Sequence, residues 1–135
     1  MHELEPPNPE SITDTLRKAL SQVQFAYVFG SFLHRSFTAE SDIDLAVELG
    51  EPLGWDAGVE LAAELQSSVG HEVDVIDLHT AGPIIRMQVL RYGKLLIETD
   101  ATARRYFEIR TISEYLDFKI DRATIEATML QRHGA

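Results

Sequence analysis

Two aspartates, Asp42 and Asp44, open a segment that otherwise alternates like a β-strand. Residues two apart on a strand point to the same face, so these carboxylates would share one face with Cα atoms roughly 6.5–7 Å apart. Like charges this close repel each other unless a cation lies between them. Oxygen-only ligands without histidine or cysteine select hard ions, above all Mg²⁺, and substrate phosphates often complete the shell. Two such ions form the clamp used in phosphoryl and nucleotidyl transfer.

A two-ion site needs a third carboxylate, and the predicted strand at 72–78 offers Asp74 and Asp77. Val73 and Val75 continue the apolar face of the earlier strand, which puts Asp74 on the polar face with the first two aspartates. We therefore predict that Asp74 is the third ligand and the base, or metal-polarising group, for an incoming hydroxyl. Asp77 is out of phase and is predicted to be a loop or capping acid.

Gly30 and Ser31 end a hydrophobic run, and ten residues separate them from Asp42. Glycine lets a backbone approach a triphosphate closely, and a serine hydroxyl with neighbouring N–H groups at a helix start can hold a phosphate. The alternative is a strand-ending turn with a serine helix cap, which any α/β protein can contain. The combination with three in-phase aspartates favours the phosphate site.

Hydrophobic periodicity predicts an α/β (α+β) fold in which these residues lie at the start of a central strand. A helix should begin after a Ser11 cap, with Asp14 as its reciprocal acid. The further predicted elements are strands at 24–29, 42–49, 72–78 and 94–98, helices at 53–70 and 82–93, and a mostly helical stretch from 101 to 131. The strand at 42–49 is expected to be half-buried, with one polar face.

Composition limits the classes of protein to consider. The chain of 135 residues is long enough for one domain, lacks cysteine and has a net charge of −10. The charge is uneven, since residues 1–85 hold 3 Lys/Arg against 15 Asp/Glu. An acidic surface argues against binding to a nucleic-acid backbone and suits a basic protein partner. We expect a cytoplasmic protein, because no signal peptide, membrane span or disulfide is predicted.

Gly30-Ser31, Asp42-Ile43-Asp44 and Asp74 together resemble the signature of the nucleotidyltransferase superfamily typified by DNA polymerase beta, and most closely its minimal nucleotidyltransferases. The resemblance covers roughly residues 12–98. It implies a small mixed sheet flanked by helices, ATP as substrate, and two Mg²⁺ ions held by the three aspartates.

The same resemblance implies that Gly30, Ser31 and Arg35 contact the nucleotide. Relatives often have an Arg-Gly pair where this chain has His34 and Arg35. Arg35 can still reach a phosphate, whereas His34 is expected to have no direct catalytic role. The departure affects the phosphate contacts and leaves the metal ligands as predicted.

Beyond the domain, "RTISEYLDFKIDRATI" resembles the helical tail of MntA antitoxins, which are encoded beside HEPN ribonuclease toxins. In that family the enzyme transfers AMP from ATP to a tyrosine of the HEPN partner and silences its RNase activity. The resemblance implies the antitoxin of a type VII-like pair, in a hetero-oligomer with its toxin. The short chain independently favours a protein acceptor, because it leaves little room for an acceptor-binding domain.

We divide the chain into a flexible N-terminus (1–10), a minimal nucleotidyltransferase domain (11–98) and a helical tail (99–135) that packs on the domain, the partner or both. One alternative function is a small-molecule nucleotidyltransferase of the aminoglycoside-modifying kind, and another is a non-catalytic toxin-binding module. Trp55 is expected to pack at a helix start rather than stack on a base. Arg104, Arg105 and Arg110 are expected to form a solvated face, with contact to partner or nucleotide as the alternative.

Overall fold

The computed structural model describes residues 9–29 and 42–133. Its elements are α1 (Pro9–Ala19), β1 (Phe25–Phe29), β2 (Ile43–Glu48), α2 (Trp55–Val69), β3 (Val73–Asp77), α3 (Pro83–Tyr92), β4 (Lys94–Glu98) and α4 (Ala101–His133). Within these residues, each predicted helix and strand is present, with bounds shifted by only a few residues, whereas the helix start expected at Ser31 lies outside them.

The start of α1 differs from the prediction. The helix begins at Pro9, so Ser11 lies inside the first turn instead of capping it, and its carbonyl oxygen accepts a hydrogen bond from the Thr15 hydroxyl at 2.9 Å. Proline suits a first turn, because its φ is already helical and the first amides have no partner within the helix. At the end of α2, Gly70 adopts φ +74°, the left-handed conformation that glycine enters without strain.

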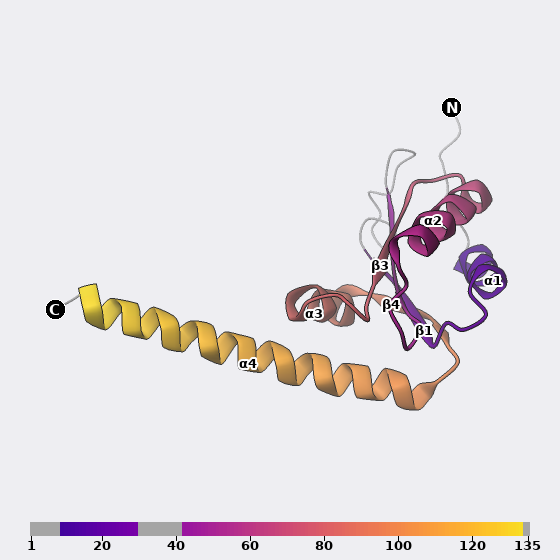
Figure 1. Ribbon diagram of the computed structural model, residues 1–135. Coiled ribbons are helices and arrows are strands. Elements are labelled where there is room, and N and C mark those ends of the chain that lie inside the picture. The colour runs from indigo at the N-terminus through magenta and orange to yellow at the C-terminus, as the bar shows by residue number, and fades with distance from the viewer. Residues whose placement is uncertain (1–8, 30–41, 134–135) are drawn as a thin grey trace.

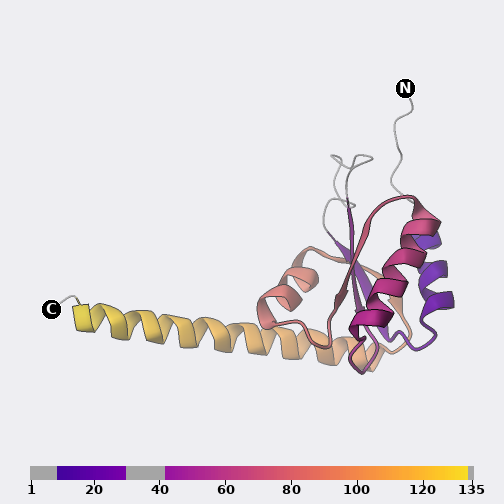
Figure 2. The same ribbon diagram turned by 45° about the horizontal axis from the view of Figure 1, so that its top comes forward.

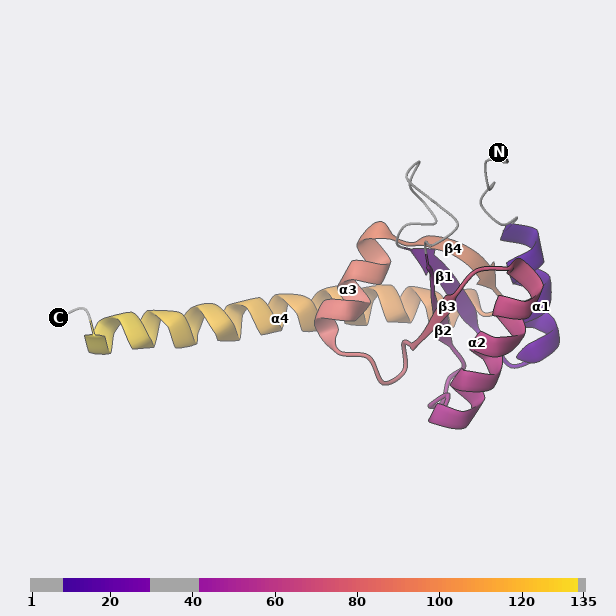
Figure 3. The same ribbon diagram turned by 90° about the horizontal axis from the view of Figure 1, so that it is seen from above.

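The four strands form one mixed sheet in the order β3-β2-β1-β4. Figures 1 and 3 show this sheet between α3 on one side and α1 and α2 on the other. β1 is antiparallel to both of its neighbours, whereas β2 and β3 are parallel. Parallel neighbours need a crossover connection, which α2 provides. The fold is therefore the small mixed sheet flanked by helices that was expected, and β3 forms one of its two edges.

One face of the sheet packs against α1 and α2 (Figure 2). The apolar residues of β2 on this face, Ile43, Leu45 and Val47, are fully buried. They contact Ile12 and Leu16 of α1 and further buried residues of α2, β1, β3 and β4. This is the larger core cluster, and the alternation of β2 predicted its orientation.

The opposite face is also covered, which corrects the expectation of a half-buried β2. α3 and the first turns of α4 pack on it, and Ala46 is fully buried there. Aromatic rings fill the contact, with Phe25 and Phe107 centroids 5.1 Å apart. This face is therefore polar only near its ends, where Asp44 lies at one end and Glu48 at the other.

Phe107 packs α4 against the sheet, since it is 7% exposed and its ring contacts the rings of Phe25 and Tyr27. We expect Phe107→Ala to lower the free energy of unfolding by about 3–5 kcal/mol, because the truncation leaves a cavity between α4 and the sheet. Ile109→Ala is the control on the same helix, since Ile109 is 70% exposed. Urea titration of both variants measures the difference, and equal loss in the two would contradict this packing.

α4 has two distinct parts. Its first turns pack on the domain, and the Arg86–Glu114 ion pair at 3.2 Å joins it to α3. Beyond that point the helix extends away from the sheet, and residues 116–131 are all exposed (Figure 1). Neither α4 nor any other helix within the described ranges is long and apolar enough to cross a membrane. The division of the chain at residue 99 stays a prediction.

Candidate active site

The pairing of β2 with β3 brings the predicted carboxylates together. Asp44 and Asp74 are register partners on these parallel strands, so their side chains point to the same face. Neighbouring strands lie about 4.7–4.9 Å apart, which makes the two carboxylates neighbours. Asp42 comes directly before β2, two residues from Asp44. The three aspartates therefore lie at one end of the sheet, at the start of both strands.

The electrostatics of Asp44 reflect this crowding. Burial raises the pKa of the Asp44 carboxyl, and the negative charges of Asp74 and then Asp42 raise it further. Each effect disfavours the ionised form. The arrangement therefore places negative charge where a cation would relieve the repulsion.

Glu72 is a fourth carboxylate at this site, and the sequence reasoning missed it. Its hydrogen bond to Asp42 raises the pKa of Glu72, and the charge of Asp42 adds to the effect. Glu72 and Asp74 are two residues apart, so the phase that selected Asp74 applies equally to Glu72. The side chain is exposed and lies at the rim of the carboxylate cluster.

The chemistry of these side chains fits Mg²⁺, because all are oxygen donors. Within residues 9–29 and 42–133, however, no group of three or more histidine, aspartate or glutamate side chains is already arranged to hold an ion. Asp44 and Asp74 are thus register partners, with Asp42 two residues from Asp44, but the three carboxylates do not form a complete coordination shell. Two Mg²⁺ ions at this place stay a prediction.

The predicted nucleotide contacts Gly30, Ser31 and Arg35, together with His34, lie outside the described residues. The described chain reaches Phe29, the last residue of β1, which is the register partner of Asp44. β1 therefore ends beside the carboxylate cluster. The roles of Gly30, Ser31 and Arg35 stay predictions.

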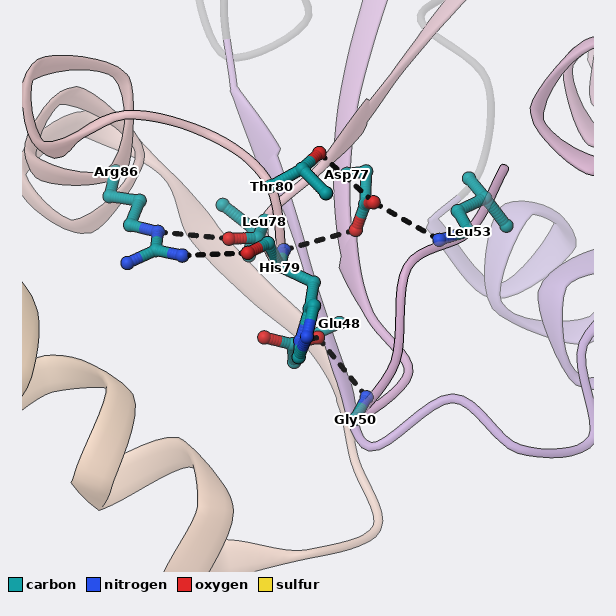
Figure 4. Close-up of polar contacts among 8 residues, drawn as sticks. All are labelled: Glu48, Gly50, Leu53, Asp77, Leu78, His79, Thr80 and Arg86. Atoms are coloured by element: carbon teal, nitrogen blue, oxygen red, sulfur yellow. Dashed lines mark hydrogen bonds and ion pairs between the residues drawn. The ribbon is translucent and has the colours of Figure 1, made fainter. Parts of the chain in front are cut away.

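Asp77 is a loop-holding acid, as its phase predicted (Figure 4). Its carboxylate accepts hydrogen bonds from the Leu53 amide at 3.0 Å, the His79 amide at 3.0 Å and the Thr80 hydroxyl at 3.1 Å. From the other side, the Arg86 guanidinium donates to two backbone carbonyls of the same turn. Asp77 thereby joins the turn after β3 to the loop that leads into α2.

We expect Asp77→Ala to lower the free energy of unfolding by about 1–3 kcal/mol, because it leaves a part-buried amide without its partner. Thr80→Val removes only one of the three hydrogen bonds and should have a smaller effect. Glu51→Ala, an exposed change in the same loop, is the control. Denaturant titration of the three variants tests this order, and a stability of Asp77→Ala equal to that of Glu51→Ala would show that the bonds do not hold the loop.

The structure corrects the expectation for Trp55. This side chain is 84% exposed and does not pack at the helix start. It lines an open groove of about 510 Å³ that also reaches Gly58, Val59, Asp74 and Val75. An aromatic side chain at a helix start commonly packs, and no local pattern in the sequence shows that this one faces a groove.

The basic cluster at the start of α4 is largely paired within the chain. Arg104 forms ion pairs with Glu98, at 2.6 Å, and with Glu108. Arg110 pairs with Glu114 at 2.7 Å. These contacts support the structural interpretation of Arg104 and Arg110, while contact with a partner or nucleotide stays untested.

Comparison with known proteins adds to this geometry. Residues 10–102 match the family described as Polymerase beta, Nucleotidyltransferase. The protein adenylyltransferase MntA of Shewanella oneidensis is 34% identical over 118 residues, which cover 87% of this chain and 84% of that protein.

Two solved structures are similar along nearly the whole chain. A toxin–antitoxin complex with AMP-PNP superimposes with a TM-score of 0.76 at 33% identity, covering 91% of this chain and 98% of the other. A tri-AMPylated Shewanella oneidensis HEPN toxin in complex with MNT antitoxin gives a TM-score of 0.74 at 30% identity, covering 90% and 95%. The chain therefore belongs to the polymerase beta nucleotidyltransferase family, in the branch of the MntA protein adenylyltransferases.

Proposed function

We propose that this chain is a Mg²⁺-dependent antitoxin that transfers AMP from ATP to a tyrosine of a cognate HEPN ribonuclease toxin and thereby neutralises it. The observation that carries the proposal is the register of Asp44 with Asp74, with Asp42 directly before β2. This arrangement supplies carboxylates for metal binding and for proton transfer at one place. The relatives with a bound AMP-PNP and with a tri-AMPylated HEPN toxin support ATP and a HEPN protein as the substrates.

The transfer forms one bond and breaks one bond. The tyrosine oxygen attacks the α-phosphorus of ATP, and the bond from that phosphorus to the bridging oxygen breaks, so pyrophosphate leaves with the bonding electrons. The hydroxyl proton passes to Asp74, the base. Asp42 and Asp44, with Asp74, would hold Mg²⁺, which when bound stabilises the negative charge that develops on the phosphate oxygens. Gly30, Ser31 and Arg35 would position the phosphates.

A protein partner fits the surface of the chain. Residues 116–131 of α4 are exposed and include Leu116, Phe118 and Ile120, which suit contact with a toxin in a hetero-oligomer. The net charge of −10 disfavours direct nucleic-acid binding. We place this complex in the cytoplasm, since the chain has no cysteine.

The crowded carboxylates lead to a prediction for the metal-free protein. The substitution Asp44→Asn should raise the melting temperature of the metal-free protein by a few degrees, because it removes a half-buried negative charge beside those of Asp74 and Asp42. Adding Mg²⁺ should raise the melting temperature of the wild type and have less effect on the variant. Thermal unfolding with and without Mg²⁺ tests both statements, and equal Mg²⁺ stabilisation of the two proteins would exclude Asp44 as a ligand.

A labelling assay distinguishes the proposed function from two other functions. A small-molecule nucleotidyltransferase would label a soluble acceptor such as an aminoglycoside without any toxin, and a non-catalytic binding module would label nothing. The test incubates the chain with α-labelled ATP and Mg²⁺, with either the neighbouring HEPN protein or an aminoglycoside, and repeats each reaction with excess chelator. We expect label on the HEPN protein only, and only without chelator. Label on the aminoglycoside alone, or on neither, would overturn the proposal.

A further inference from the structure

The free edge of β3 lies beside the proposed base. β3 is one of the two edge strands of the sheet in the described part of the chain. The Glu72 carbonyl accepts a hydrogen bond from the Ile43 amide, and the Leu78 amide donates one to the Val47 carbonyl. The backbone N–H and C=O groups of the even-numbered residues of β3 therefore point toward β2. The backbone groups of the odd-numbered residues point away from β2, and the Val73 amide accordingly donates to the Gln66 side chain. The amide and carbonyl of Val75 therefore point outward, next to Asp74.

An apolar groove adjoins this edge. It is formed by β3, the loop at 52–54 and one side of α2, where Trp55, Val59 and Ala62 follow one another at helical spacing. Trp55 is 84% exposed and Val59 is 50% exposed. Exposed tryptophan beside a groove is typical of a residue that anchors a protein partner. The hydrogen bonds of Asp77 hold the loop that forms the end wall.

Strand alternation fixes what an added strand would present to each side. A residue aligned with Asp74 on such a strand projects to the same face as Asp74, about 4.7–4.9 Å away. Its two neighbours project to the opposite face, toward Trp55 and Val59. A hydroxyl-bearing residue flanked by apolar residues would thus direct its hydroxyl over the carboxylate face of the sheet and place its flanks in the groove.

We propose that an extended segment of the acceptor protein binds as an added strand on β3, with its tyrosine in register with Asp74 and the flanking residues in the groove. This inference rests on the proposed function and identifies the surface that selects the acceptor. Main-chain hydrogen bonds to Val75 supply affinity, and the groove supplies specificity, as in other strand additions. The exposed acids Asp56 and Glu60 of α2, with the exposed Glu72 directly before β3, favour a segment that carries basic residues.

The first test uses the double variant Trp55→Ala/Val59→Glu with the full HEPN protein as acceptor. Both residues are exposed, so folding should be retained. We expect the KM for the acceptor to rise about tenfold or more, while kcat and the affinity for AMP-PNP stay within about twofold. Tyr92→Ala/Ile109→Glu is the matched control, because it changes an exposed aromatic and an exposed aliphatic side chain elsewhere. An unchanged KM in the groove variant would overturn the proposal.

The second test follows the Val75 amide by hydrogen exchange in the wild-type complex. Strand addition should slow its exchange about tenfold or more on binding, whereas loss of the acceptor restores fast exchange. Unchanged exchange would show that the acceptor does not pair with β3. If the wild type labels the toxin but either test fails, only the added strand is wrong. If the wild type labels nothing, the proposed function itself is wrong.

Discussion

Replacing Asp42 and Asp44 together by asparagine should reduce transfer of AMP to the toxin by about a thousandfold or more. The two changes remove the negative charge that would hold Mg²⁺, while the amides keep nearly the same size and shape. Asp44 is half-buried and is the register partner of Asp74, so its negative charge lies beside a second one. Initial rates of label transfer from α-labelled ATP measure the loss.

The control for this pair is Asp14→Asn/Glu64→Gln, which removes two exposed carboxylates from α1 and α2. It changes the net charge equally and should leave the rate within about twofold, because surface charges away from a site have small effects. A double Asp42/Asp44 variant that retained more than a tenth of the wild-type rate would remove these residues from the metal site.

Asp74→Asn should lower kcat by about 10²–10⁴-fold, the usual contribution of a positioned base. Binding of AMP-PNP should change much less, because Asp42 and Asp44 remain. The register of Asp74 with Asp44 puts its carboxylate beside the site, and its exposure leaves it accessible to an incoming hydroxyl. Single-turnover rates with the HEPN protein, together with AMP-PNP titration, separate the two effects.

Glu72→Gln is the matched control for Asp74, since it removes a carboxylate two residues earlier on the same face. We expect it to retain kcat within a few-fold, because Glu72 is at the rim and contacts Asp42. Equal losses in the two variants would mean that total negative charge matters, and Asp74 would lose its role as base.

Much of the fold follows from local patterns in the sequence. The strict alternation of β2 predicted which of its side chains form the apolar face, and the phase of β3 separated Asp74 from Asp77. Both placements are confirmed, because the alternation of side chains between the two faces is a local property of a strand. Glu72 lies in the same phase as Asp74, so the sequence pattern indicated this carboxylate as well, although it was not predicted.

Other features depend on tertiary packing that no local pattern records. The direct pairing of Asp44 with Asp74 needs the parallel register of two strands that are separated along the chain by α2. The burial of Ala46 needs α3 and α4 to cover the second face. Likewise, Trp55 is exposed because the start of α2 lies open beside the edge of β3. Reasoning from local patterns could single out these residues, but it could not place their neighbours.

The most direct test of this assignment is the intact mass of the HEPN toxin after co-expression with the chain. With the wild type, we expect the toxin mass to increase by one or more AMP units on a tyrosine, and RNase activity to be lost. With the Asp42→Asn/Asp44→Asn variant, the mass should be unchanged and the RNase active. A toxin that is unmodified yet inactive with both proteins would contradict neutralisation by AMP transfer and would establish neutralisation by binding alone.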